Sequence, residues 1–149
     1  MIYKLSLTKW EQRFLDLAEY ISKWSLDPST QVGAVITDRN NRIVSLGFNG
    51  FPQKIKDTSK RLNNRELKNS FILHGENNAI LFAKQDLTGC CITTFPFQPC
   101  SRCTSVIIQV GIIKCVAPKI PERLIERWGA DVKLGKQLFE EAGVELILV

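Results

Sequence analysis

Two short motifs lie far apart in this chain and must come together in space if they are to form one metal site. This requirement constrains the fold more than any other feature of the sequence. They are His74-Gly75-Glu76 and Pro99-Cys100-Ser101-Arg102-Cys103. One imidazole and two thiolates can bind zinc, and three protein ligands leave the fourth tetrahedral position open, as in catalytic zinc sites. The sequence therefore predicts one catalytic Zn²⁺ per subunit, with His74, Cys100 and Cys103 as its ligands.

Glu76 is predicted to be the catalytic residue, because it follows a zinc ligand closely and is not needed as a ligand itself. A carboxylate in that position can move protons beside a zinc-bound water. Both motifs lie at predicted helix starts, where the helix dipole lowers the pKa of thiols and favours anions. The pairing of H-x-E with P-C-x-x-C is typical of zinc-dependent nucleobase deaminases.

Two simpler interpretations remain open at this point. Zinc could stabilise the fold through a fourth ligand from Cys90, Cys91 or Cys115, or no metal could bind at all. These three cysteines lie in apolar, strand-like segments, where a free cysteine behaves as a small buried hydrophobe. His74 is the only histidine of the chain, so no other histidine can complete the site.

The chain has 149 residues, of which 44% are hydrophobic, and this predicts a single globular domain over residues 1–149. No segment approaches the roughly 18 consecutive apolar residues of a membrane span. The first residues lack the apolar core of a signal peptide, so a cytoplasmic location is expected. The five cysteines form no disulfide pattern.

Positive charge is unevenly distributed along the chain. The formal net charge of +5 suits a phosphate-bearing ligand or a nucleic acid. The basic residues of the segment 54–68 are Lys54, Lys56, Lys60, Arg61, Arg65 and Lys68. This segment is either a solvated loop or a loop that meets anionic phosphates.

Hydrophobic periodicity predicts alternating helices and strands. A capping box at Thr8-Lys9-Trp10-Glu11 opens a first helix, whose apolar stripe we expect in the core. That stripe consists of Trp10, Phe14, Leu17, Ile21 and Trp24. Strands are predicted over 31–37, 43–48, 90–95, 112–117 and 144–149, and further helices over 74–84, 101–110, 121–128 and 132–142. The stretch from the second strand to about residue 69 is expected to be irregular. This order implies an α/β fold, a three-layer α/β/α sandwich around a five-stranded mixed sheet.

Beyond the metal motifs, the chain resembles the deoxycytidylate (dCMP) deaminases over nearly its whole length. The resemblance rests on Asp27-Pro28-Ser29-Thr30-Gln31-Val32-Gly33-Ala34, Gly47-Phe48-Asn49-Gly50-Phe51-Pro52, Glu76-Asn77-Asn78-Ala79-Ile80 and Ala142-Gly143-Val144. It implies the cytidine-deaminase-like version of the sandwich and the hydrolysis of dCMP to dUMP and ammonia, a step toward dTMP. It also implies a homo-oligomer, expected to be a hexamer, that dCTP with Mg²⁺ activates and dTTP inhibits.

The same resemblance implies roles for particular residues. His74, Cys100 and Cys103 match zinc ligands, and Glu76 matches a proton shuttle. Substrate contacts are expected from Thr30, Val32, Ala34, Asn49, Gly75 and Pro99. Effector contacts are expected from Asn49, Gly50, Phe51, Lys54, Lys56 and Asn78. Two departures stand out: Gly75 replaces the family's usual alanine, and residues 94–99 differ from the usual approach to the second motif. With a single histidine, no second, structural zinc is expected.

Other functions are compatible with the same metal motifs. A deaminase of tRNA adenosine or of polynucleotides needs a basic surface leading into its pocket. The chain holds no RNA-binding motif, so neither a nucleic acid nor a membrane is expected as a partner. Deamination of free bases, nucleosides or pterin-like compounds is a further alternative. A zinc-bearing module that only senses deoxynucleotides is another, although such a module has no use for the proton shuttle Glu76.

Overall fold

The computed structural model describes residues 2–3 and 6–149. Its helices are α1 (Lys9–Ser22), α2 (Ser59–Asn63), α3 (Arg65–Phe71), α4 (Gly75–Ala83), α5 (Ser101–Gln109) and α6 (Glu122–Ala142). Its strands are β1 (Ile2–Tyr3), β2 (Gly33–Thr37), β3 (Ile43–Phe48), β4 (Cys91–Phe95), β5 (Lys114–Ala117) and β6 (Glu145–Leu148).

The strands form one mixed sheet in the order β1-β6-β5-β4-β2-β3. Strands β1, β6, β5 and β4 run parallel, whereas β2 pairs antiparallel with both β3 and β4. The predicted five-stranded mixed sheet is confirmed, and the two-residue strand β1 adds a sixth strand at its edge. Within the described part of the chain, no helix has the length and apolar character needed to cross a membrane.

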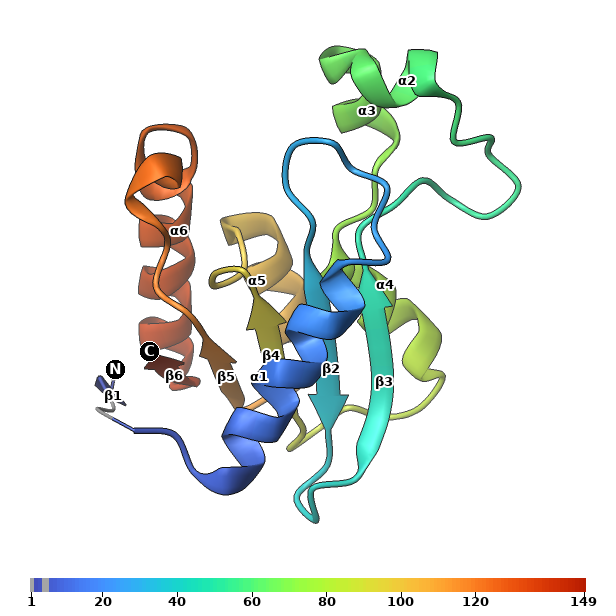
Figure 1. Ribbon diagram of the computed structural model, residues 1–149. Helices are drawn as coiled ribbons and strands as arrows, with labels where there is room; N and C mark the ends of the chain where they lie inside the picture. The colour runs from blue at the N-terminus through green and yellow to red at the C-terminus, as the bar shows by residue number, and fades with distance from the viewer. Residues whose placement is uncertain (1, 4–5) are drawn as a thin grey trace.

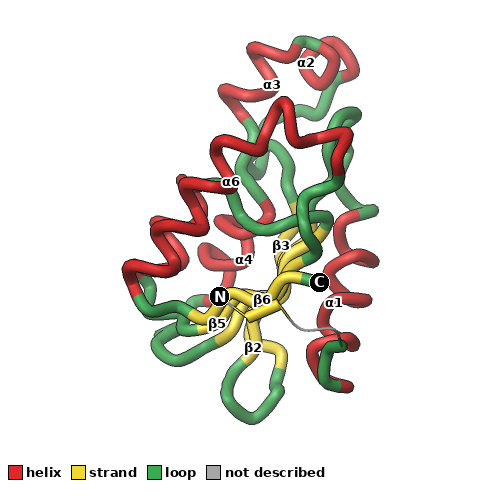
Figure 2. The backbone as a smooth tube through the Cα atoms, turned by 90° about the vertical axis from the view of Figure 1, so that its left-hand side faces the viewer, coloured by secondary structure: helices red, strands yellow, loops and turns green. Residues whose placement is uncertain are grey.

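Helices cover both faces of the sheet, as the predicted sandwich requires. Helix α1 packs on one face, mainly over β2 and β4, and α4, α5 and α6 form a layer on the other (Figures 1 and 2). Strand β2 serves both layers because successive side chains of a strand point to opposite faces. Ala34 and Ile36 join the core beneath α4–α6, whereas Val35 packs against Phe14 and Ala18 of α1.

The capping box predicted for α1 is confirmed. The Thr8 backbone N–H donates to Glu11 Oε2 at 2.8 Å, and the Glu11 N–H donates to Thr8 Oγ1 at 3.2 Å. The predicted core stripe of this helix is correct only in its middle. Phe14 and Ile21 are buried, but Trp10 is 44% and Trp24 is 53% exposed. Trp24 follows the end of α1 and reaches the edge strand β3, where its ring meets that of Phe48 at 6.0 Å.

The stretch before residue 69, which was expected to be irregular, forms the two short helices α2 and α3. Each begins with a side-chain cap: Thr58 accepts from the Arg61 N–H, and Asn64 accepts from the Leu67 N–H. These helices project beyond the end of the sheet, above α4 in Figure 1. Local capping, rather than an apolar stripe, therefore sets their boundaries.

The two helices predicted over 121–128 and 132–142 are one continuous helix, the 21-residue α6. Gly129 lies within this helix and does not interrupt it, since a glycine inside a helix costs only about 1 kcal/mol relative to alanine. The Asp131 carboxylate of α6 accepts hydrogen bonds from the backbone N–H and the hydroxyl of Ser101. These bonds hold the helix against the start of α5 and offset that cost. The helix ends at Gly143, whose φ is +70°.

Helix α4 packs against β3 at backbone distance, and Gly47 permits this approach. A Cβ at Gly47 would collide with the backbone nitrogen of Ala79 and the carbonyl oxygen of Gly75. Because Gly75 also follows the predicted zinc ligand His74, the closeness of β3 to α4 helps set the position of that ligand.

Replacing Gly47 with alanine is expected to lower the free energy of unfolding by about 3 kcal/mol, since two backbone segments must move apart. Urea unfolding followed by circular dichroism measures this change. Gly50→Ala is the matched control, because no atom lies within 4 Å of a Cβ built there. Equal losses in both variants would contradict the close-packing role of Gly47.

Candidate metal centre and active-site cavity

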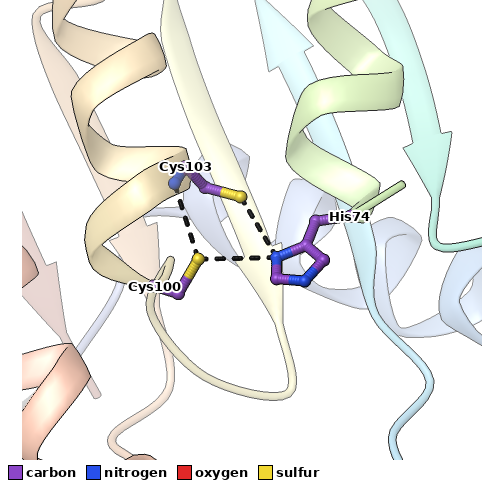
Figure 3. Close-up of side chains that lie close together, drawn as sticks. All are labelled: His74, Cys100 and Cys103. Carbon is purple, nitrogen blue, oxygen red and sulfur yellow. Dashed lines mark hydrogen bonds between the residues drawn. The ribbon is translucent and has the colours of Figure 1, made fainter. Parts of the chain in front are cut away.

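Three side chains from the starts of two neighbouring helices converge on one point (Figure 3). His74 is the N-cap of α4 and Cys100 is the N-cap of α5, with Cys103 in the first turn of α5. The Sγ atoms of Cys100 and Cys103 lie 3.4 and 3.3 Å from His74 Nδ1. The Cys103 backbone N–H also donates to Cys100 Sγ at 3.5 Å.

The spacing of these atoms fits a zinc ion. Zn–N bonds of about 2.0 Å and Zn–S bonds of about 2.3 Å at tetrahedral angles place nitrogen and sulfur about 3.5 Å apart. Among the described residues, His74, Cys100 and Cys103 are the one group of metal-ligating side chains with such spacing. Cys90, Cys91 and Cys115 lie outside it. This arrangement opposes a structural zinc with a fourth cysteine, and it leaves one coordination position for another molecule.

The three ligands differ in how firmly they hold their protons in the metal-free protein. Hydrogen bonding to the Cys103 thiol, and then to His74, lowers the pKa of Cys100 to about 4. Donating that bond, together with burial, raises the pKa of Cys103. The hydrogen bond to Cys100 raises the pKa of His74 to about 9, although burial acts in the opposite direction. Cys100 is therefore the ligand already deprotonated at neutral pH.

Glu76 lies beside the metal ligands, in the first turn of α4. It is 4% exposed, and its Oε2 atom has no hydrogen-bond partner among the described residues. Burial raises the pKa of this carboxyl, and the nearby positive charge of His74 acts against the rise. A buried carboxyl with one free oxygen and a raised pKa is suited to receive and return a proton.

The metal ligands and Glu76 border a cavity with about 570 Å³ of space free of atoms, part of which is open to solvent. The cavity is lined by Asp27, Ser29, Thr30, Val32, Asn49, Asn69, Ile72, His74, Glu76, Phe97, Gln98, Cys100, Arg127 and Trp128.

The structure separates the six residues expected to contact the substrate into two groups. Thr30, Val32 and Asn49 line the cavity. Ala34, Gly75 and Pro99 are buried and do not line it. Gly75 stands close to its neighbours: a Cβ there would lie 3.1 Å from the Val32 carbonyl oxygen and 3.3 Å from Phe48 Cα. The family's usual alanine would therefore need a small shift of the neighbouring backbone.

Asn49 holds the cavity loop in place through its own side chain. Its Oδ1 accepts from the Val32 N–H at 2.8 Å, and its Nδ2 donates to the Thr30 carbonyl at 2.8 Å. Asp27 supports the same loop, because its Oδ1 accepts from the backbone N–H groups of Ser29 and Thr30 at 2.7 and 3.3 Å. The cavity wall between Asp27 and Val32 is thus fixed by two polar side chains.

Lys68 completes this network from α3. Its Nζ lies 2.8 Å from Asp27 Oδ1 and 3.1 Å from Ser29 Oγ, and its side chain is 2% exposed. The sequence placed Lys68 with the basic loop residues, and this was wrong: Lys68 is a buried partner of Asp27. The charges near Lys68 in the sequence did not indicate that this lysine is buried, because its partner Asp27 lies 41 residues away.

The residues expected to contact the effector lie in three different places. Gly50, Phe51 and Asn78 line a second hollow, together with the apolar side chains of Leu46, Phe48, Leu73, Leu81 and Phe82. Asn49 belongs to the zinc-site cavity instead. Lys54 and Lys56 are exposed and line neither hollow.

Phe97 and Gln98, from the segment 94–99 that departs from the family's usual approach to the second motif, line the cavity. Sequence reasoning missed the two side chains that α6 contributes to it, Arg127 and Trp128. No motif marks them, although a tryptophan beside an arginine in an otherwise polar helix is a signal that could have been followed.

Zinc binding at about pH 7 is expected to release about two protons, because His74 and Cys103 hold theirs in the metal-free protein and Cys100 does not. Zinc affinity should therefore increase as the pH rises toward the His74 pKa of about 9. Calorimetric titration in buffers of different ionisation enthalpy measures the protons released.

Two cysteine variants control this measurement. Cys103→Ala should bind zinc far more weakly and release fewer protons, whereas Cys91→Ala, outside the ligand group, should behave as the parent does. Equal affinities of the two variants would refute the ligand assignment.

Comparison with known proteins places this geometry in a family. The family model for the cytidine and deoxycytidylate deaminase zinc-binding region matches residues 8–119. An uncharacterized deaminase from the region 3′ of luxG in Aliivibrio fischeri is 49% identical over 140 residues, covering 94% of this chain and 93% of its own length. A probable deoxycytidylate deaminase of Drosophila melanogaster is 40% identical over 114 residues, covering 69% of this chain and 56% of its own length.

A solved structure shares the fold. The dCMP deaminase of cyanophage S-TIM5, in complex with dCMP and dUMP, superposes with a TM-score of 0.74 at 21% identity, covering 97% of this chain and 99% of its own. The chain spans nearly all of the Aliivibrio relative and about half of the Drosophila one. On the match to residues 8–119 and the identity to these relatives, the chain belongs to the cytidine and deoxycytidylate deaminase family.

Proposed function

We propose that this protein hydrolyses dCMP to dUMP and ammonia. The observation that carries the proposal is the buried Glu76 carboxyl, with one unpartnered oxygen, beside three zinc-ligating side chains that border a cavity. Relatives named as deoxycytidylate deaminases, including the Drosophila one, support dCMP as the substrate. The product dUMP would serve as a precursor of dTMP.

His74, Cys100 and Cys103 would hold the zinc ion, which when bound makes water acidic enough to react at neutral pH. Glu76 Oε2 would take a proton from the attacking water and deliver it to the ring nitrogen of the base. The new C–O bond forms at the carbon that bears the amino group. The same carboxyl would then take the proton of the new hydroxyl group and pass it to the amine as the C–N bond breaks, so that the hydroxyl becomes the carbonyl of the product and ammonia leaves.

Asn49 would orient the sugar while it holds the loop. Its Oδ1 uses one lone pair on the Val32 N–H, and the second can accept from a sugar hydroxyl. Thr30 and Val32 would form the wall beside it. Binding of the sugar thus depends on the same side chain that keeps the wall in place.

Glu76→Gln is expected to bind zinc as the parent does but to lower kcat on dCMP by about 10²- to 10⁴-fold, because the amide cannot shuttle a proton. Ammonia release and elemental analysis measure the two effects. Glu66→Gln, an exposed acid in the first turn of α3, is the control and should retain parental turnover. Parental turnover by Glu76→Gln would refute the mechanism.

We further propose that the protein assembles as a homohexamer that dCTP with Mg²⁺ activates and dTTP inhibits. The second hollow supports this proposal, because Gly50, Phe51 and Asn78 line it beside the exposed side chains of Leu81 and Phe82. Gly50 exchanges two backbone hydrogen bonds with Leu73, at 3.1 and 2.8 Å. Leu73 precedes the zinc ligand His74, and Gly50 follows Asn49, so a ligand in this hollow would act on neighbours of the active site.

Lys54 and Lys56 would meet the effector's triphosphate from their exposed loop. Replacing both with alanine should weaken the response to dCTP and to dTTP by about tenfold or more in effector concentration, with little change in turnover without effector. Rates of ammonia release over a range of effector concentrations measure this. Lys84→Ala, at the opposite end of α4, is the control. An unchanged response in the double variant would place the effector elsewhere.

A further inference from the structure

Helix α3 forms part of the active-site cavity although it projects beyond the end of the sheet (Figure 1). Asn69 of this helix and its C-cap residue, Ile72, line the cavity. The helix packs mainly against α2 and makes few contacts with the strands or with the other helices. This part of the cavity wall therefore needs a support other than core packing.

The Lys68 side chain supplies that support from the middle of α3. It is 2% exposed, and its ammonium group donates to Asp27 Oδ1 at 2.8 Å and to Ser29 Oγ at 3.1 Å. Asp27 and Ser29 belong to the loop between α1 and β2, and both line the cavity. One buried ammonium group thus joins two separate parts of the cavity wall.

Asp27 extends this link to the rest of the loop. Its Oδ1 also accepts from the backbone N–H groups of Ser29 and Thr30, and its Oδ2 lies 3.4 Å from Asn49 Nδ2. Asn49 in turn donates to the Thr30 carbonyl and accepts from the Val32 N–H, both at 2.8 Å. The position of the Lys68 ammonium group therefore bears on the side chain proposed to orient the sugar.

A buried ion pair is a costly way to join two segments. Both ions lose their hydration, and an apolar pair of similar volume often gives equal or greater stability. The ion pair differs from an apolar contact in its directionality, because charge-assisted hydrogen bonds require short distances to particular acceptors.

We propose that Lys68 is a positioning residue for substrate binding, which holds the α3 wall and the Asp27–Val32 wall of the cavity at the separation that a bound nucleotide requires. This inference rests on the proposed dCMP deamination. Lys68 acts through Asp27 and does not touch the substrate itself, because it is buried and does not line the cavity.

The metal centre is insulated from this ion pair. The ligand His74 follows the end of α3 by three residues. Between them, Leu73 exchanges two backbone hydrogen bonds with Gly50, at 3.1 and 2.8 Å. Release of α3 should therefore change the cavity wall and leave the zinc ligands and Glu76 in place.

The first test is Lys68→Met, which keeps a long side chain and removes the ammonium group. The KM for dCMP should rise by about tenfold or more, since small displacements of positioning groups have large effects, while kcat stays within about threefold. Zinc content by elemental analysis should equal that of the parent. Lys68→Arg, which can still pair with a carboxylate, should recover part of the KM. A merely structural role would lower kcat through loss of folded protein and leave KM unchanged.

A double variant separates positioning from stability. Lys68→Met alone leaves the Asp27 carboxylate buried without a counter-ion, which destabilises the fold. Adding Asp27→Asn removes that charge and keeps an oxygen that accepts from the loop N–H groups, but it does not restore the link to α3. The double variant should therefore resist urea better than Lys68→Met and still show the raised KM. A KM that returns to the parental value together with the stability would overturn the proposal.

Lys60→Met is the matched control, because Lys60 is an exposed lysine of α2 on the same projecting segment. It changes the net charge by the same amount and should leave KM, measured without effectors, within about twofold, since salt screens exposed charges. Equal effects of Lys60→Met and Lys68→Met would overturn the proposal in favour of general attraction between the segment and an anionic substrate.

A binding measurement separates this inference from the proposed function. Calorimetry on the zinc-loaded Glu76→Gln protein should show that dCMP binds about tenfold or more weakly when Lys68→Met is added. That result without turnover by the parent would support the positioning role and refute the deaminase activity. Turnover of dCMP by the parent, with a KM that does not respond to Lys68→Met, would refute the positioning role alone.

Discussion

The whole structure depends on two helix starts meeting at one point. His74 is the N-cap of α4 and Cys100 is the N-cap of α5, and the two helices lie side by side on the same face of the sheet. The mixed sheet makes this possible, because it places β3 and β4 on either side of β2. Helix α4 packs against β3, and β4 leads into α5. Backbone N–H groups and dipoles directed at the ligands favour a thiolate at Cys100 before any metal binds.

Around this point, polar residues build the walls of the cavity. Asn49 and Asp27 hold the loop on one side, and Asp131 and Gln98 hold α6 on the other. Neither set touches the metal ligands directly. Each nevertheless fixes the distance between those ligands and the surface that a substrate would contact, which is the condition for orienting a reacting group.

Motifs with a fixed local meaning were predictable from the sequence, and contacts between distant segments were not. The convergence of His74, Cys100 and Cys103 could be predicted because three metal ligands carry their own geometry. The capping box at Thr8 could be predicted because it is local. The exposure of Trp24 could not, since it depends on where α1 ends relative to the sheet. Arg127 and Trp128 were missed for the same reason, because only the packing of α6 on α5 brings them to the cavity.

The buried pair of Lys68 and Asp27 indicates which positions near the cavity tolerate substitution and which do not. It joins positions 41 residues apart and ties the projecting α2–α3 segment to the cavity loop. Removing one partner would leave a buried charge uncompensated, at a cost of about 3–5 kcal/mol, so the two positions can change only together. The exposed residues of α2 bear no such restriction. A designer could therefore graft a different loop between Phe51 and Asn64 and still inherit the cavity, provided that Asn49 and both ends of this pair are kept.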